Sequence, residues 1–197
     1  MRIIKLNRIV ISVSLTAVAL CLAPSALAQA KPNQNDLPNF HRINENLFRG
    51  GQPTEDGFKI LSQLRIKTVV NLRDNDERAR AEGDAARAAG LNYFNLPLAH
   101  FEKPADERVA QILSIITASE NQPVFVHCKR GADRTGTIIA VYRIAHDGWT
   151  SAQAKDEAKQ FGLGFWQVQM KDYISDYYRH KLENSPVAVP LHKTHLR

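Results

Sequence analysis

The sequence predicts an α/β domain with a central, mostly parallel sheet of four or five strands and helices on both faces. Short β-branched segments alternate along the chain with segments in which apolar residues recur at helical spacing. The strand predicted at residues 123–127 and the helix predicted at residues 135–146 are apolar on nearly all sides, which places both at the centre of the fold. With 44% hydrophobic residues among 197, the chain suits one domain with a sizeable core.

The first half of the domain is predicted to alternate two strands with two helices. A short strand at residues 46–49 leads through a glycine-rich turn into a helix that Thr54 can cap. The β-branched run at residues 68–72 predicts the second strand. Residues 76–89, rich in alanine, glutamate and arginine, predict a helix that ends at Gly90.

The second half continues the alternation through the two central elements and closes with helices. The helix after the third strand has apolar residues at i, i+3, i+4 and i+7, which is the spacing of one buried face. In chain order the predicted elements are a strand at 93–98, a helix at 105–119, the central strand and helix named above, and helices near 151–160 and 167–182.

The first 28 residues have the order of a signal peptide. A basic flank precedes an uncharged apolar run, Ile9 to Ala23, and small residues stand at the −3 and −1 positions before the bond after Ala28. The run is short for a bilayer span, so cleavage after Ala28, or after Ala30, is favoured over a retained anchor. This predicts export to the periplasm or beyond, with no stable membrane insertion after cleavage.

The predicted organisation is a signal peptide at 1–28, a flexible leader at 29–39, the folded domain at 40–183 and a loose C-terminal tail at 184–197. Cleavage removes three cations and no acid, which lowers the net charge from +6 to +3. That balance suits anionic substrates and gives no support to nucleic-acid binding. The histidines of the tail have no cysteine or carboxylate neighbours, so no metal site is predicted.

Cleavage would also remove one of the two cysteines, Cys21, and leave Cys128. A lone thiol in an exported protein is either buried and inert or reactive. Cys128 lies in the loop between the central strand and the central helix, HCKRGADRTG at residues 127–136. Open α/β folds bind ligands at the carboxyl ends of strands, where a helix begins and its backbone N–H groups favour an anion.

The residues of this loop suit a phosphate group. Gly131 permits a conformation in which successive amides converge, and Arg134 offers a planar fork for two phosphate oxygens. The same field favours a thiolate, so Cys128 is the candidate nucleophile. His127 is expected to hold the loop by hydrogen bonds, and the hydroxyl of Thr135 can assist release of the thiolate. The expected substrate-binding residues are Lys129, Arg130, Gly131, Ala132, Asp133 and Arg134.

Five residues between cysteine and arginine make a loop wide enough to surround a tetrahedral phosphate. Sulfurtransferases of the rhodanese type also place a cysteine between a strand and a helix, but typically in a loop one residue shorter. They are therefore a distant alternative, which a cyanide–thiosulfate assay would distinguish. A non-catalytic phosphate-binding module is a third alternative, although neither the cysteine nor the arginine is missing here.

The string HCKRGADRTG is similar to the His-Cys-x5-Arg-Ser/Thr-Gly signature of the cysteine-dependent protein tyrosine and dual-specificity phosphatases. The segments LFRGGQP, KTVVNLR and YRIAHDGW resemble small atypical dual-specificity phosphatases, including secreted bacterial ones, over roughly residues 40–180. The resemblance implies the compact cysteine-phosphatase fold and two-step hydrolysis of a phosphate monoester through a cysteinyl-phosphate. It implies no metal and no cofactor. The implied substrate is a phosphorylated protein or a small phosphate ester, with an inositol phosphate or a phosphoinositide as the alternative.

The leaving group needs a proton, so the resemblance implies a general acid above the loop. The superfamily usually draws an aspartate from the segment corresponding to residues 97–106, where Glu102 lies in the loop and Asp106 is expected to cap or begin a helix. Asp133 precedes Arg134, a position from which some lipid and tyrosine phosphatases are thought to use an aspartate as the acid. Asp133 and Glu102 are the two leading candidates, Asp106 is third, and His100 is a further possible donor.

Overall fold

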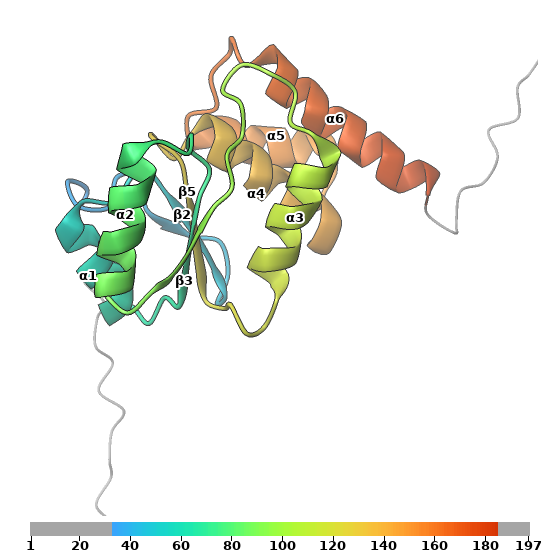
Figure 1. The fold of residues 1–197 in the computed structure, drawn as a ribbon. Helices are drawn as coiled ribbons and strands as arrows, with labels where there is room; N and C mark the ends of the chain where they lie inside the picture. Colours follow the sequence, from blue (N-terminus) through green and yellow to red (C-terminus); the bar gives the residue numbers. More distant parts are fainter. Residues whose placement is uncertain (1–32, 185–197) are drawn as a thin grey trace, which may run out of the picture. The chain divides into compact units, whose positions relative to one another are not determined.

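The computed structural model describes residues 33–184, so the predicted signal peptide and all but the first residue of the predicted tail lie outside the described residues. Five strands form one sheet in the order β1-β2-β5-β3-β4 (Figure 1). The strand β1 is antiparallel to β2, and all other neighbours are parallel, which confirms the predicted α/β class. The strands are β1 His41–Arg42, β2 Leu47–Gly50, β3 Thr68–Asn71, β4 Asn92–Asn95 and β5 Val124–His127.

Strand β5 lies at the middle of the sheet, between β2 and β3. Its last residue, His127, is in register with Gly50 of β2 and Asn71 of β3. The three strands therefore end at the same edge, and the chain emerging from β5 begins with Cys128. This is the edge at which open α/β folds bind ligands.

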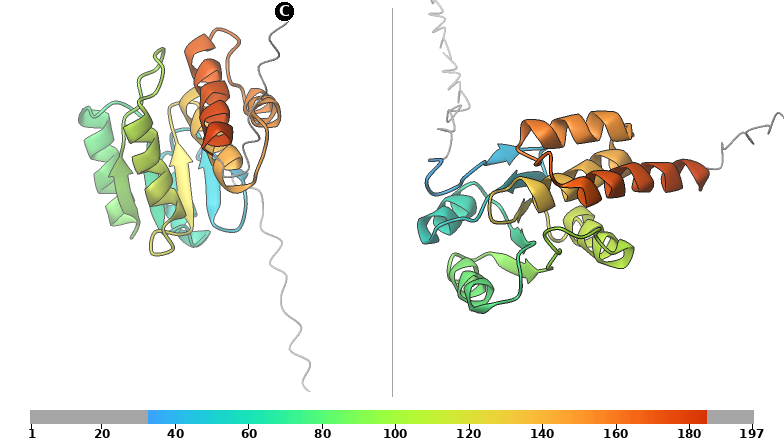
Figure 2. Two further views of the ribbon diagram at one scale, coloured as in Figure 1. Left: turned by 90° about the vertical axis from the view of Figure 1, so that its right-hand side faces the viewer. Right: turned by 90° about the horizontal axis from the view of Figure 1, so that it is seen from above.

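Within residues 33–184, six helices pack around the sheet in two unequal layers (Figures 1 and 2). Helices α1 and α2 cover one face, while α3 and α4 cover the other. Helices α5 and α6 pack on α4, whose outer side is thereby buried as well. The helices are α1 Glu55–Gln63, α2 Glu77–Ala88, α3 Asp106–Thr117, α4 Asp133–His146, α5 Ser151–Gln160 and α6 Val168–Glu183.

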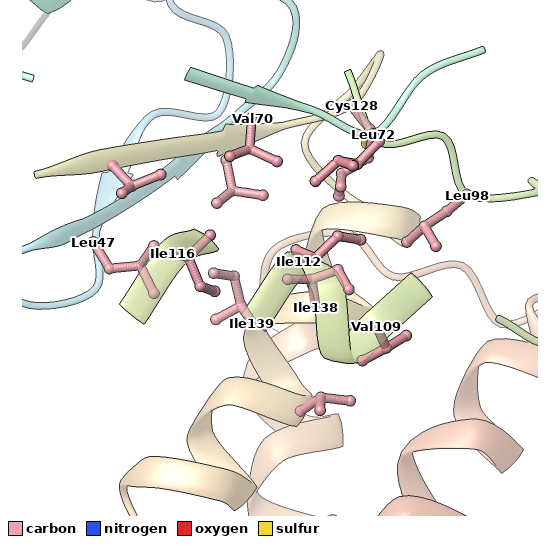
Figure 3. Packing of buried hydrophobic residues seen from close by; sticks show 14 of the residues in the cluster. Leu47, Val70, Leu72, Leu98, Val109, Ile112, Ile116, Cys128, Ile138 and Ile139 are labelled. Atoms are coloured by element: carbon pink, nitrogen blue, oxygen red, sulfur yellow. The ribbon is translucent and has the colours of Figure 1, made fainter. Parts of the chain in front are cut away.

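Successive residues of the central strands feed two separate cores. Val69 and Phe125 pack against α1 and α2. Val70, Val124 and Val126 pack against α3 and α4 on the other face, where Figure 3 shows Val70 together with Ile112 and Ile139. Because side chains alternate across a strand, a strand covered on both faces buries every position, and most of these positions are therefore apolar. All four residues of β5 are buried, as the apolar run in the sequence predicts.

Helix α4 is also buried on most sides, because it lies between the sheet and the pair α5 and α6. The helix begins at Asp133, two residues before the predicted start, since the N–H of Gly136 already donates to the carbonyl of Ala132. As a consequence, Arg134 and Thr135 belong to the first turn of the helix rather than to the loop.

Local signals set the ends of several elements. The hydroxyl of Thr54 accepts a hydrogen bond from the N–H of Gly57 and caps α1 as predicted. Helix α2 ends before Gly90, which has a φ of +80°. The strand predicted at 93–98 ends at Asn95, short of Pro97, which has no N–H for a ladder. Strand β1 was not predicted, because two residues are too few for a pattern.

Candidate active site

The loop after β5 lines a cavity of about 370 Å³ at the carboxyl edge of the sheet. Cys128 and Arg134, the two residues on which the phosphate interpretation depends, both lie on its wall. Each is buried, with 3% and 7% of its surface exposed. Within residues 33–184, Cys128 is the free cysteine. The complete lining is His100, Cys128, Lys129, Arg130, Asp133, Arg134 and Trp166.

The tight fit of the loop depends on Gly131. Its φ is +70°, and a Cβ atom added there would lie 2.4 Å from the carbonyl carbon of Gly50. A side chain at this position would push the loop away from the end of β2. The N–H of Gln52 also donates to the carbonyl of Lys129, so the turn after β2 supports the loop from the side.

The guanidinium of Arg134 is fixed by the ends of two neighbouring strands. Its Nη1 donates to the carbonyl of Leu72 at 3.3 Å and to that of Leu98 at 3.5 Å. Its Nε has no hydrogen-bond partner among residues 33–184, although it is buried. A buried N–H without a partner is costly, and an anion in the cavity would satisfy it.

Asp133 connects three segments around the cavity. Its Oδ1 accepts a hydrogen bond from the N–H of Gly164 at 2.9 Å, and its Oδ2 accepts one from Nη2 of Arg130 at 2.6 Å. The Nε2 atom of His100 lies 3.5 Å from the same Oδ2. The carboxylate therefore ties the start of α4 to the loops before α3 and before α6.

The other two acid candidates lie apart from Asp133. Glu102 is exposed in the loop before α3 and does not line the cavity. Asp106 is the first residue of α3, as predicted, and lines a second cavity of about 350 Å³ together with Tyr173 and Tyr177. Of the candidates considered, Asp133 and His100 are the two on the cavity wall.

The remaining loop residues differ in what they contact. Lys129 and Arg130 are exposed at the cavity, and the buried Ala132 stands at the N-terminus of α4. The Oγ1 atom of Thr135 is buried and has no hydrogen-bond partner in the part of the chain that the structure describes. His127 lies fully buried, with its Nδ1 atom 3.3 Å from the carbonyl oxygen of Cys128.

Three residues behind the loop were missed by the sequence analysis. The Nδ2 atom of Asn39 donates to the carbonyls of Arg130 and Gly131, and Nη2 of Arg49 donates to the carbonyl of Gly131 at 2.6 Å. Glu82 of α2 lies 2.6 Å from His127. No local pattern marks them, because an arginine in a strand and a glutamate in a charged helix are ordinarily exposed.

Arg49 is a fully buried cation whose guanidinium lies 4.3 Å from the ring centre of Phe161. Burial lowers its pKa to about 10, although negative charge on Glu157 and on Cys128 works against this shift. A cation whose pKa is lowered by folding destabilises the folded state below that pH, here by about 3 kcal/mol, and stability rises as the pH rises through and above 10.

We therefore expect Arg49→Met to leave the free energy of unfolding unchanged, or to raise it by up to about 3 kcal/mol. The carbonyl of Gly131 keeps its bond from Asn39, at 3.1 Å, but loses the shorter one. We expect kcat/KM to fall about tenfold as the loop loosens. Urea denaturation and steady-state kinetics measure the two effects. A less stable variant with full activity would contradict this account of Arg49.

Among residues 33–184, no group of three or more histidine, cysteine, aspartate or glutamate side chains is arranged to hold a metal ion. In the same range, none of the helices has both the length and the apolar character needed to cross a bilayer.

A family model described as "DSP-PTPase phosphatase fused to NAD+ Kinase" matches residues 31–176. The dual specificity protein phosphatase TpbA of Pseudomonas aeruginosa is 33% identical over 127 residues, which are 64% of this chain and 56% of TpbA. The chain thus matches little more than half the length of that relative. Inositol diphosphatase DSP4 of Arabidopsis thaliana is 24% identical over 154 residues, covering 76% of this chain and 77% of that protein.

Solved structures give the same result at the level of the fold. The crystal structure of P. aeruginosa TpbA superposes with a TM-score of 0.62 at 28% identity, covering 81% of this chain and 99% of that one. A cysteine-to-serine variant of TpbA has been solved in complex with pTyr, and it superposes with a TM-score of 0.62 at 27% identity, covering 79% of this chain and 96% of that one.

Proposed function

We infer that the protein hydrolyses phosphate monoesters, because the chain belongs to the DSP-PTPase phosphatase family. One structural observation supports this reaction. The thiol of Cys128 and the guanidinium of Arg134 line the same cavity, at the end of the central strand and at the start of the central helix. Phosphoryl transfer to a thiol requires a nucleophile and, on the same wall, a group that donates two hydrogen bonds to the phosphate.

The reaction we propose has two steps. The thiolate of Cys128 attacks phosphorus, the bond from phosphorus to the ester oxygen breaks, and that oxygen leaves with a proton from a general acid. Water then attacks phosphorus of the cysteinyl-phosphate and gives a proton to the conjugate base of the general acid. The bond from phosphorus to sulfur breaks, inorganic phosphate is released, and Thr135 donates to the departing sulfur. Arg134 and the loop amides hold the equatorial oxygens in both steps. His127 holds the loop and contacts no substrate.

We propose a phosphorylated protein, with phosphotyrosine first, as the substrate. Trp166 supports this choice because its indole lines the cavity and is half exposed, so it can pack against an aryl ring. The pTyr complex of TpbA supports it by analogy. An inositol phosphate is the second candidate, which the similarity to inositol diphosphatases and the exposed cations Lys129 and Arg130 favour.

A substrate panel tests the proposal. We expect the purified protein to release phosphate from a phosphotyrosine peptide with the highest kcat/KM, followed by a phosphoserine peptide and inositol polyphosphates. Vanadate, which mimics the transition state of phosphoryl transfer, should inhibit the hydrolysis of every substrate in the panel. Release of phosphate from none of them, with sulfur transfer to cyanide instead, would replace the proposal with the sulfurtransferase.

The general acid is proposed to be Asp133 or Glu102. Its position on the cavity wall supports Asp133. What supports Glu102 is that its exposed carboxyl group has no hydrogen bond or ion pair within residues 33–184. A general acid matters most for poor leaving groups. We expect Asp133→Asn to slow hydrolysis of phenyl phosphate at least tenfold more than that of nitrophenyl phosphate, and to flatten the basic limb of the pH–rate profile.

Two further variants sort the candidates. Glu102→Gln should show the leaving-group effect if Glu102 is the acid, and Asp106→Asn serves as the control because Asp106 lines the other cavity. An equal loss on both substrates in Asp133→Asn would mean that Asp133 only braces the loop. If none of the three variants discriminates between leaving groups, His100 is the next donor to test.

We propose that the protein is exported and acts in the periplasm or outside the cell, with residues 40–183 as the catalytic domain. The support is the order of residues 1–28, which lie outside the described part of the chain. We expect mass spectrometry of the exported protein to find an N-terminus at Gln29, or at Lys31 if the second site is used. A protein confined to the cytoplasm with Met1 retained would contradict the proposal.

A further inference from the structure

A buried carboxylate, Glu82 of α2, lies behind the cysteine loop. Its side chain is 3% exposed, and its Oε1 atom forms an ion pair with Nε2 of His127 at 2.6 Å. The contact is an ion pair by distance, and neither atom has a hydrogen-bond partner in residues 33–184. His127 directly precedes Cys128, so this pair is joined to the proposed nucleophile through one peptide unit.

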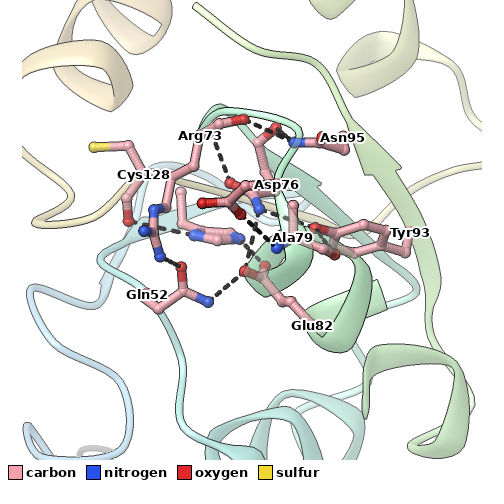
Figure 4. Close-up of polar contacts among 10 residues, drawn as sticks. Gln52, Arg73, Asp76, Ala79, Glu82, Tyr93, Asn95 and Cys128 are labelled. Carbon is pink, nitrogen blue, oxygen red and sulfur yellow. Dashed lines mark hydrogen bonds and ion pairs between the residues drawn. The ribbon is translucent and has the colours of Figure 1, made fainter. Parts of the chain in front are cut away.

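The other oxygen of Glu82 is held by two amide groups. Its Oε2 accepts a hydrogen bond from Nδ2 of Asn71 at 3.1 Å and a second from Nε2 of Gln52. Nη1 of Arg73 donates in turn to Oε1 of Gln52, so a cation stands at the end of this chain (Figure 4). The donors of Asn71 and Gln52 occupy Oε2, so Glu82 presents its other oxygen, Oε1, to His127 as an acceptor.

Both ring nitrogens of His127 face an acceptor. Its Nδ1 atom lies 3.3 Å from the backbone carbonyl oxygen of Cys128, and a carbonyl only accepts. Its Nε2 atom lies 2.6 Å from the carboxyl group of Glu82. A ring with a hydrogen on both nitrogens would suit the two contacts; such a ring is an imidazolium and would place a positive charge next to Cys128.

We propose that Glu82 is a positioning residue that holds His127 as an imidazolium against the backbone of Cys128 and thereby favours the thiolate. The proposal rests on the proposed role of Cys128 as nucleophile. The groups packed around His127 besides Glu82 are Asn71 from β3 and the ring of Phe125, stacked at 5.6 Å. Two cations lie near Cys128 as well: Arg49 interacts with it electrostatically, and Arg134 lines the same cavity.

Alkylation of Cys128 by iodoacetamide tests the proposal without any phosphate ester. Glu82→Gln keeps the shape of the side chain but removes its charge, so His127 gives up a proton. We expect the pH of half-maximal alkylation to rise by about one unit, which is a tenfold lower rate at acid pH, with the alkaline plateau unchanged. Glu77→Gln, an exposed glutamate of the same helix, is the control and should leave the profile unchanged. Peptide mass spectrometry measures the alkylation of Cys128 separately from that of Cys21.

Damage to the cysteine loop would change the alkylation rate at every pH, so only a displaced pH profile of alkylation supports a role for the charge of Glu82. An unchanged profile in Glu82→Gln would overturn the proposal. If that variant does not fold, ¹⁵N NMR of the wild-type histidines decides, since a neutral His127 ring at pH 7 would overturn the proposal and a doubly protonated ring would support it. If the wild-type protein hydrolyses no phosphate ester but the Glu82→Gln profile is displaced, the proposed function alone is refuted.

Discussion

Replacing Cys128 with serine is expected to lower kcat for an aryl phosphate by at least about a thousandfold. The cavity keeps its shape because the two side chains are nearly the same size, and Arg134 still donates from its wall. The hydroxyl is far harder to ionise than the thiol, so the field of the loop that favours a thiolate cannot produce an equally reactive alkoxide.

Stopped assays with nitrophenyl phosphate measure the loss, and calorimetric titration with vanadate measures binding. We expect vanadate still to bind the Cys128→Ser protein, although without a bond to sulfur, because the arginine and the amides remain. Cys21→Ser is the matched control, since Cys21 lies in the predicted signal peptide and should be silent. Activity of Cys128→Ser within tenfold of wild type would remove the covalent mechanism.

Replacing Arg134 with lysine is expected to cost on the order of 3 kcal/mol of transition-state stabilisation, about a hundredfold in kcat/KM. A lysine supplies a point charge, whereas the guanidinium is anchored to the carbonyls of Leu72 and Leu98 by Nη1 and retains other donors for an anion. A lysine on one of these carbonyls would have fewer N–H groups left for the phosphate.

The matched control is Arg143→Lys, the same substitution farther along α4. The guanidinium of Arg143 binds Glu157 and Asp147, and it does not line the cavity. This variant should lose stability but keep kcat/KM within a factor of three. Near-normal kinetics in Arg134→Lys would mean that Arg134 takes no part in binding the phosphate.

Most of the fold follows from patterns that are local in the chain. The apolar runs of β3 and β5 predict buried strands, because a strand covered on both faces has no position for a polar side chain facing water. The hydroxyl of Thr54 and the positive φ of Gly90 act within one helical turn, so their effects on α1 and α2 are readable from the sequence. The pairing of β1 with β2 has no such signal.

The sequence by itself determined that Cys128 and Arg134 lie close together where a buried strand leads into a buried helix. Five intervening residues cannot carry the two far apart, whatever the rest of the chain does. What only the tertiary structure decided is which side chains stand around that loop. Asp133 proved to be held by Gly164, and Glu102 to lie outside the cavity, because these relations depend on how segments distant in the chain pack.

The same reason explains why Arg49 and Glu82 were missed. Each is a charged residue within a pattern that ordinarily faces water. Arg49 is buried because the cysteine loop and Phe161, at the end of α5, close over it, and Glu82 is buried because α2 packs beside His127. Burial of a charge is stable when a partner from another part of the chain meets it, and such a partner lies at no fixed spacing along the sequence. The reactive pair could therefore be predicted from the chain, while the charges that support it required the fold.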